Sequence, residues 1–84
     1  MFHIYIHRRA GKGREPTFDT SGENKDEFAL SQYSDVANQI AHELCEIYHA
    51  PISVYEGAIW RNTFRWGRKE VSGVIQDSPN GYGF

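Results

Sequence analysis

The chain has 84 residues and a formal net charge of −2, with 39% hydrophobic and 14% aromatic residues. This length supports one domain with a single modest core and leaves no room for a second core. The only cysteine, Cys45, excludes an internal disulfide and zinc frameworks built from several cysteines. A lone thiol fits a reducing compartment, and the first residues have no basic start and no long apolar run. We therefore expect a cytoplasmic protein with no signal peptide and no membrane span.

Charge is distributed unevenly along the chain. Residues 1–14 hold four basic and no acidic residues, residues 15–56 hold nine acidic residues and one basic residue, and residues 57–84 hold four basic and two acidic residues. The near-neutral total therefore combines two basic segments with an acidic one. The choice of partner should depend on which face is presented.

The first predicted element is a strand over residues 2–7. Its side chains alternate between apolar and polar, which predicts that Ile4 and Ile6 face the core while the histidines face outward. The following segment, 10–27, is rich in glycine and charged residues, so we expect a long mobile loop there, with a brief strand at residues 17–19.

The rest of the chain is organised around a predicted helix over residues 33–48. Its apolar residues recur at steps of three and four, which places them on one helix face. We expect Ser31 or Ser34 to cap its start, Asp35 to favour the same end through the helix dipole, and Pro51 to end the helix. The apolar stripe comprises Tyr33, Val36, Ala37, Ile40, Ala41, Leu44, Ile47 and Tyr48.

Three antiparallel strands are predicted after the helix, in a meander. Alternating side chains and glycine-containing turns indicate them. The last strand is the weakest because Gly73 interrupts it. The tail, residues 78–84, has no periodicity and is expected to be loose. The predicted strands cover residues 52–56, 58–66 and 70–76, with turns at 56–57 and 67–68.

These elements predict a single α+β domain over residues 1–84, with one helix packed on one face of a small sheet. The predicted order is strand, long loop, helix and three-stranded antiparallel meander. Phe28 and Leu30 are expected to cover one end of the core. The predicted core consists of Ile4, Ile6, Val36, Ile40, Leu44, Ile47, Ile52 and Val54.

A metal site on the helix was considered. His42, Glu46 and His49 lie at steps of four and three residues, so they share one helix face. Imidazole and carboxylate groups are transition-metal ligands, but a solvated polar face is expected there in any case, and zinc needs three or four converging ligands. We therefore predict no metal and no cofactor.

A catalytic role for the first strand was also considered. His3 and His7, next to Arg8 and Arg9, carry the groups needed for acid–base cleavage of a phosphodiester. At about 3.3 Å per strand residue the two imidazoles lie roughly 13 Å apart, too far to share one phosphate. A toxin-type nuclease is thus a distant alternative, and we predict no catalytic residue and no enzyme.

The meander concentrates aromatic residues and arginines. Trp60, Phe64 and Trp66 fall on one face of the predicted strand, and two interpretations stay open. These residues are core facing the helix, or they form a binding face for a protein or for single-stranded nucleic acid. The net negative charge argues against nucleic acid as the main partner. Under either interpretation the arginines stay exposed: Arg61, Arg65 and Arg68.

In its small size, single domain and lack of a catalytic motif the chain resembles the small inhibitors of phages and mobile elements, including the anti-CRISPR proteins. The resemblance lies in the overall plan and in no particular residue. It implies a viral protein that binds and blocks a larger complex in the host cytoplasm. We predict a non-enzymatic protein-binding module, with a small nucleic-acid-binding protein as the alternative. The predicted binding residues are Asp35, Glu43 and Glu46, which are favoured, and Arg61, Arg65 and Arg68.

Overall fold

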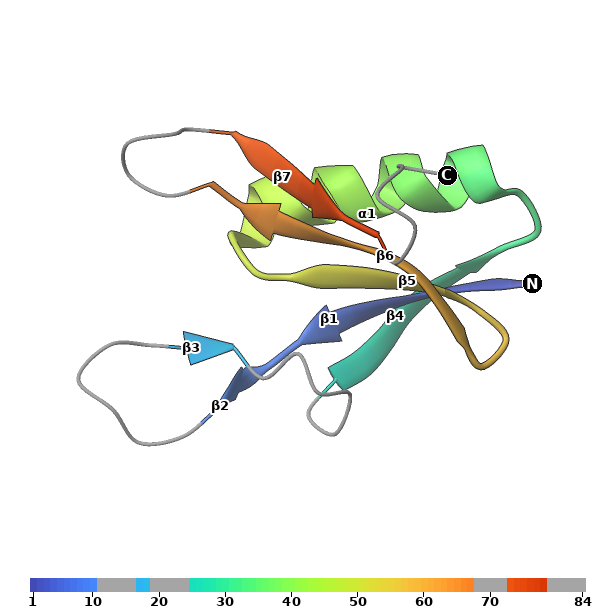
Figure 1. Ribbon diagram of the computed structural model, residues 1–84, viewed down its shortest axis with the longest axis horizontal. Helices are drawn as coiled ribbons and strands as arrows, with labels where there is room; N and C mark the ends of the chain where they lie inside the picture. The colour runs from blue at the N-terminus through green and yellow to red at the C-terminus, as the bar shows by residue number, and fades with distance from the viewer. Residues whose placement is uncertain (11–16, 19–24, 68–72, 79–84) are drawn as a thin grey trace.

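The computed structural model describes residues 1–10, 17–18, 25–67 and 73–78. One helix lies on one face of a five-stranded antiparallel sheet (Figure 1), which confirms the predicted α+β class. The strand order in this sheet is β4-β1-β5-β6-β7, and β2 pairs with β3 separately. The elements are β1 Phe2–His7, β2 Arg9–Ala10, β3 Thr17–Phe18, β4 Lys25–Ser31, α1 Ser34–Tyr48, β5 Ile52–Glu56, β6 Ile59–Trp66 and β7 Val74–Asp77.

Strand β4 corrects the predicted loop over residues 10–27. Within that segment β3 agrees with the brief strand expected at residues 17–19, whereas the start of β4 was not predicted. β4 pairs antiparallel with β1 along its length. Ile4 pairs with Ala29 and Tyr5 with Glu27, so Phe28 is an extra residue in β4. This bulge breaks the alternation by which a strand is recognised. The charged residues at the start of β4 are also uncommon in strands.

The expectation that Phe28 and Leu30 cover the core is wrong, because both side chains are about half exposed. β4 is the edge strand of the sheet, so only one of its sides is paired. Leu30 pairs with His3, whose side chain alternates with the core residue Ile4. Leu30 therefore lies on the sheet face that α1 does not cover.

The start of α1 differs from the predicted serine cap. Its N-cap residue is Tyr33, which makes no side-chain capping bond. The Ser31 hydroxyl accepts a hydrogen bond from the Tyr33 backbone N–H at 3.1 Å and so fixes the turn that precedes the helix. Ser34 is the first helical residue. Neither serine therefore caps the helix.

The end of α1 agrees with the prediction from Pro51. His49 adopts a left-handed conformation with φ of 50°, and its backbone N–H donates to the Cys45 carbonyl at 2.9 Å. This geometry is a common way to satisfy a terminal carbonyl. The chain then turns directly into β5.

The core lies between α1 and the three strands β1, β5 and β6. Four of the predicted core residues are buried, and Ile6 and Ile40 are partly buried against them. Phe64 completes the cluster from β6. The confirmed buried residues are Ile4, Leu44, Ile52 and Val54.

Val36 and Ile47 were also predicted to be core, and this is wrong: they are 40% and 70% exposed. The buried face of α1 instead includes Ala37, Ala41 and Cys45, which are fully buried. Small side chains let a helix backbone approach a sheet closely. The contact between α1 and the sheet is therefore centred on these small residues. The apolar stripe of α1 is thus wider than the contact, and one flank is left in solvent.

A bulge in β6 changes the predicted aromatic face. The pairing of β5 with β6 shifts between Val54 and Tyr55, which leaves Arg61 as an extra residue and pairs Tyr55 with Trp60. A shift of one residue moves side chains to the other face of a sheet. Phe64 is therefore in the core, whereas Trp60 lies on the face opposite α1, and the predicted shared face is wrong for Trp60.

The third strand of the meander, β7, covers Val74–Asp77 and pairs antiparallel with β6. The predicted start of this strand, the turn at Arg68 and the tail 79–84 lie outside the described residues. Within the described part of the chain, no helix is long and apolar enough to cross a membrane.

Candidate functional site

Two solvent-facing surfaces carry the candidate binding residues. One is formed by the exposed side chains of α1 and by Phe28 of the neighbouring edge strand, and we call it the α1 surface. The other is the sheet face that α1 does not cover, and we call it the outer sheet face. The α1 surface comprises Phe28, Tyr33, Asp35, Val36, Glu43, Glu46, Ile47 and Tyr48.

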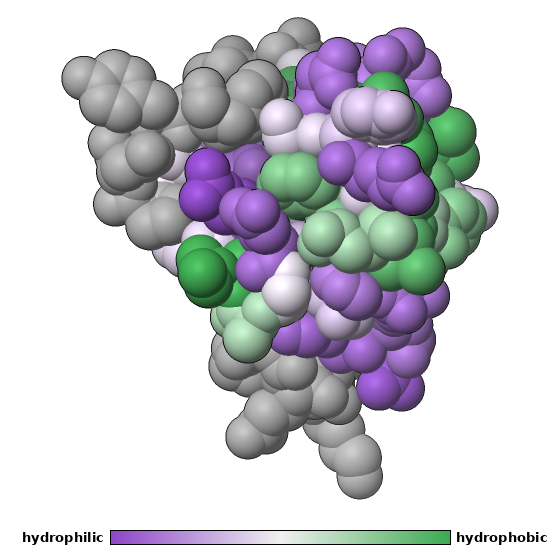
Figure 2. Space-filling model, turned by 90° about the vertical axis from the view of Figure 1, so that its right-hand side faces the viewer, coloured by the Kyte–Doolittle hydropathy of each residue, from purple (hydrophilic) through white to green (hydrophobic). Residues whose placement is uncertain are grey.

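The apolar part of the α1 surface follows one stripe. Val36 and Ile47 are exposed, and the partly buried Ile40 lies between them. Steps of four and seven residues place these three side chains along one side of the helix. At the C-terminal end of α1, Tyr48 meets Phe28 with ring centroids 6.2 Å apart. Figure 2 views the end of the molecule where α1 begins. Hydrophobic side chains gather at the centre and on the right of this view, with hydrophilic side chains between them.

The acidic part of the α1 surface has no basic counterpart on the helix. Asp35, Glu43 and Glu46 are exposed, and the helix contains no lysine or arginine. Among the described residues, no lysine or arginine forms an ion pair with them, and His42 Nε2 lies 4.0 Å from Glu46 Oε1. The structure thus brings these three predicted binding residues onto one element, where no lysine or arginine of the described residues neutralises their charge.

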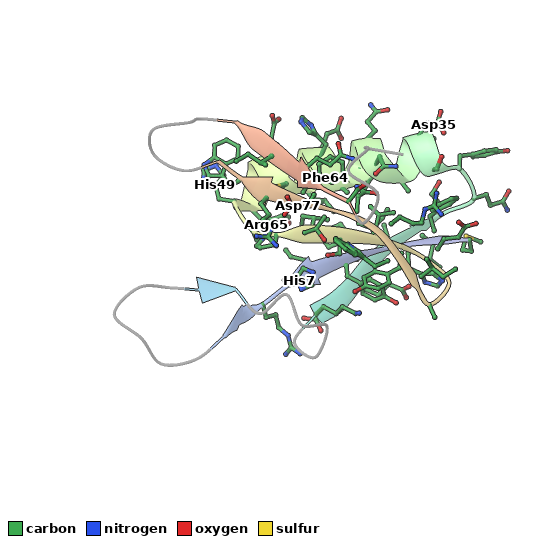
Figure 3. All side chains as sticks on the ribbon, viewed as in Figure 1. His7, Asp35, His49, Phe64, Arg65 and Asp77 are labelled. Carbon is green, nitrogen blue, oxygen red and sulfur yellow. The ribbon has the colours of Figure 1, made fainter. Side chains whose placement is uncertain are left out.

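The predicted arginines are placed differently. Arg61 Nη1 lies 3.6 Å from Glu56 Oε1, and Arg65 Nε lies 2.9 Å from Asp77 Oδ2. Figure 3 shows Arg65 and Asp77 beside each other on neighbouring strands. Both arginines therefore have acidic partners within the chain. Arg68 lies outside the described residues.

The helix residues considered for a metal contact aromatic rings of β6. His42 meets the edge of Phe64 at 5.8 Å, and His49 stacks on Trp66 at 4.2 Å between ring centroids. Figure 3 shows His49 at the opposite end of α1 from Asp35. Across the described ranges, no three histidine, cysteine, aspartate or glutamate side chains are grouped so as to hold a metal ion.

On the outer sheet face, aromatic rings and a lysine contact one another. Tyr5 and Tyr55 meet edge to face, with centroids 5.4 Å apart. Lys25 Nζ lies 4.7 Å from the first ring centroid and 4.1 Å from the second. A cation over a ring face is attracted by the negative face of the ring. This part of the face is thus held together by its own side chains.

A chain of hydrogen bonds crosses three strands on the same face. His7 Nε2 lies 2.5 Å from Ser53 Oγ, which lies 2.8 Å from Thr63 Oγ1, and Trp60 Nε1–H donates to that Thr63 oxygen at 2.8 Å. His7, Ser53 and Thr63 are each at most 4% exposed. His7 thus lies on the outer face, as expected, but the expectation that it is exposed is wrong, because its side chain is buried within this row of hydrogen bonds.

The geometry does not bring the two histidines of β1 together. His3 contacts the Glu27 carboxylate on β4, whereas His7 is engaged with Ser53 on β5. An acid–base pair acting on one phosphate needs both imidazoles within hydrogen-bond reach of the substrate. This arrangement does not offer such a pair.

Beside the hydrogen-bond chain lies a pocket of about 220 Å³, lined by Ser53, Tyr55, Trp60, Thr63 and Arg65. Sequence reasoning found Arg65 but missed the two hydroxyl residues. Alternation in the predicted strand places Ser53 on the face opposite Ile52 and Val54, so its position could have been predicted from the sequence. Thr63 and Trp60 meet only because of the bulge at Arg61, which no local sequence signal announces.

Cys45 is fully buried in the core on α1. Burial, with the charge of the adjacent Glu46 as a smaller cause, raises the pKa of its thiol to about 11. The thiolate is the reactive form of cysteine. Cys45 is therefore a packing residue of the core whose thiol is poorly reactive.

No protein-family model, curated protein or solved structure shows significant similarity to this chain. An assignment of function must therefore come from the chemistry of its own surfaces.

Proposed function

We propose that this protein is a non-enzymatic protein-binding module that engages its partner through the α1 surface. The observation that carries the proposal is the exposure of large apolar side chains at the C-terminal end of α1: Ile47 is 70%, Tyr48 52% and Phe28 51% exposed, and the rings of Tyr48 and Phe28 meet. Contiguous exposed apolar groups mark interaction sites. The carboxylates of α1, which have no lysine or arginine partner among the described residues, add a charge that selects the partner.

The chemistry of the α1 surface defines the partner. Val36, Ile40 and Ile47, at steps of four and seven residues along one side of α1, suit a second helix that lies along α1 and contributes its own apolar side chains. The carboxylates of α1 require lysine or arginine beside those apolar side chains. The partner is thus a protein that presents a basic amphipathic helix.

The finer proposal is that binding inhibits a larger host complex, as the resemblance to anti-CRISPR proteins implies. An acidic helix competes for basic surfaces that otherwise hold phosphate groups, and the carboxylates of α1 have the required sign. The small size of the domain suits a role in which occupation of a surface is the whole activity. Phage origin and action in the host cytoplasm belong to this finer proposal.

A defined probe tests the proposal. A fluorescent synthetic peptide of leucine and lysine at helical spacing is titrated with the full chain, and anisotropy gives the dissociation constant. We expect saturable binding that weakens at least about tenfold in Ile47→Ser or in the triple variant Asp35→Lys, Glu43→Lys, Glu46→Lys, because each removes one of the two complementary features.

Two controls test the peptide and the protein separately. A scrambled peptide of leucine and lysine, without helical spacing, should bind at least about tenfold more weakly than the helical one. The variant Arg61→Glu, Arg65→Glu changes charge elsewhere and should keep the affinity. If the scrambled peptide binds as well, or if only the arginine variant loses binding, the α1 surface is not the interface.

A second candidate function is single-stranded nucleic-acid binding by the outer sheet face. It is favoured by the combination of Tyr55, Trp60, Arg65 and Lys25 on one face, since aromatic rings and cations together hold unpaired bases and phosphates. A mobility-shift titration at low and physiological salt tests it. Retention of single-stranded DNA or RNA with a steep salt dependence would support this candidate over the first.

A further inference from the structure

The pocket on the outer sheet face has the properties of a second site, distinct from the α1 surface. Its volume of about 220 Å³ exceeds the roughly 150 Å³ of an engineered cavity that holds benzene. A planar ring with one substituent therefore fits. The site lies on β5 and β6, on the opposite face of the sheet from α1.

Two aromatic side chains form the walls of the pocket. Tyr55 and Trp60 are direct cross-strand partners, and such side chains stand next to each other on one sheet face. Trp60 is fixed by its hydrogen bond to Thr63. Aromatic walls held in place favour a planar, apolar ligand body.

The floor of the pocket is formed by the hydroxyls of Ser53 and Thr63. The three hydrogen bonds that link His7, Ser53, Thr63 and Trp60 need three hydrogens, and the indole N–H and the two hydroxyls supply three. When His7 carries a hydrogen on Nε2, that N–H donates to Ser53 and one hydroxyl hydrogen is released. The Thr63 hydroxyl can then donate into the pocket. A ligand that accepts a hydrogen bond selects this arrangement.

The mouth of the pocket is flanked by cations. Arg65 pairs through Nε with Asp77, and its guanidinium has further N–H donors. Lys25 Nζ lies 4.1 Å from the ring centroid of Tyr55, one of the walls. The guanidinium of Arg65 in the lining, with Lys25 against the ring of Tyr55, favours an anionic acceptor group on the ligand.

We propose that this pocket binds a small aromatic carboxylate. The ring lies between Tyr55 and Trp60, and the carboxylate accepts hydrogen bonds from Arg65 and from the Thr63 hydroxyl. Binding turns the Thr63 O–H toward the ligand. His7 then adopts the neutral tautomer that carries its hydrogen on Nε2: the imidazole takes one hydrogen on Nε2 from water and returns one from Nδ1, so no net proton is bound. The site thus recognises two parts of the ligand, its aromatic ring and a carboxylate at a fixed distance from that ring.

The test is an NMR titration of the full chain with benzoate. The indole N–H resonance of Trp60 reports the pocket, and that of Trp66, which stacks on His49 across the sheet, is an internal control. We expect a saturable shift of the Trp60 signal alone. Arg65→Gln should weaken binding at least about tenfold, because it removes a hydrogen-bonded charge. Arg61→Gln, an ion-paired arginine of the same strand outside the pocket, should leave binding unchanged.

Further arms decide the role of each group. Benzamide has the same ring without the charge and should bind at least about tenfold more weakly. Nitrogen NMR of His7 in the complex should show the hydrogen on Nε2. Ile47→Ser on α1 should leave benzoate binding unchanged, which separates this site from the proposed function.

Four results would overturn the proposal: no saturable Trp60 shift, equal shifts at Trp66, equal binding of benzamide, or a complex in which His7 Nε2 carries no hydrogen. A Trp60 shift produced by a single-stranded oligonucleotide and not by benzoate would also overturn it, and would assign the pocket to a nucleic-acid face.

Discussion

The α1 surface and the outer sheet face differ in how their side chains are partnered. On the outer sheet face, Lys25 lies over Tyr5 and Tyr55, and Arg65 is paired with Asp77. On α1, the exposed carboxylates have no lysine or arginine partner among the described residues, and large apolar groups face solvent. The charged groups of the outer sheet face thus have partners within the chain. The exposed carboxylates and apolar groups of the α1 surface are available to a partner molecule.

This difference ranks the two surfaces for protein binding. An arginine whose charge is already compensated by an acid of the chain adds less to a protein interface than an uncompensated charge does, although its remaining N–H groups can still donate to a small anion. An unpaired carboxylate beside exposed apolar area gains both Coulomb energy and burial when a basic, apolar partner covers it. The α1 surface therefore has the larger unused binding capacity.

The largest expected effect separates the two flanks of α1. Leu44→Ala should cost about 2–5 kcal/mol of unfolding free energy, because Leu44 is buried and its loss leaves a cavity. Ile47→Ala, three residues further along, should cost less than about 0.5 kcal/mol, because Ile47 is mostly exposed. Chemical denaturation of both variants measures the difference. Equal losses would mean that the helix is rotated and that the α1 surface is core.

The next effect tests the order of the outer sheet face. Ser53→Ala removes a buried hydroxyl that links His7 to Thr63, and leaving buried groups unpaired costs about 1–3 kcal/mol. Ser31→Ala, which removes a hydroxyl bonded locally to Tyr33, should cost less. Denaturation curves compare the two. A cost for Ser53→Ala below that of Ser31→Ala would show that the hydrogen-bond chain does not order this face.

A smaller effect depends on pH and on Cys45. Its folded pKa of about 11 lies above the ordinary thiol value of 9.0, so the folded chain holds the thiol proton more tightly than the unfolded chain. The associated stability is complete below pH 9 and falls as the pH rises toward 11. Cys45→Ala should flatten this decline when melting is followed between pH 8 and 11. A decline that is unchanged in the variant would assign it to other groups.

The smallest expected effect concerns the carboxylates of α1. Replacement of Asp35, Glu43 and Glu46 by lysine should change stability by less than about 0.5 kcal/mol each, since these side chains are exposed. A thermal melt of the triple variant checks this. An unchanged melting temperature shows that the variant is folded and can be used in the binding experiments. A large loss would mean that the carboxylates stabilise the fold itself.

The sequence predicted the elements whose signals are local. Alternation located β1 and β5, and the periodicity of the apolar residues with Pro51 located α1 and its end. β4 and the face of Trp60 escaped prediction for one reason: each depends on a bulge, at Phe28 and at Arg61, and a bulge becomes visible only against the neighbouring strand.

Some of the candidate binding residues could be predicted from the sequence, and others could not. Asp35, Glu43 and Glu46 share α1 by helical spacing alone. The exposure of Ile47 was not predictable, because a stripe of apolar residues does not reveal how much of its width the sheet covers. The hydroxyls of Ser53 and Thr63 meet through strand pairing, which residue type does not encode.

One measurement tests the central claim most directly: mapping of backbone amide NMR shifts on the full chain as the basic amphipathic peptide is added. The account predicts that the shifts concentrate at Val36, Glu43, Ile47 and Tyr48, and that Tyr55 and Arg65 stay unmoved. Shifts confined to the outer sheet face, with α1 unaffected, would contradict it.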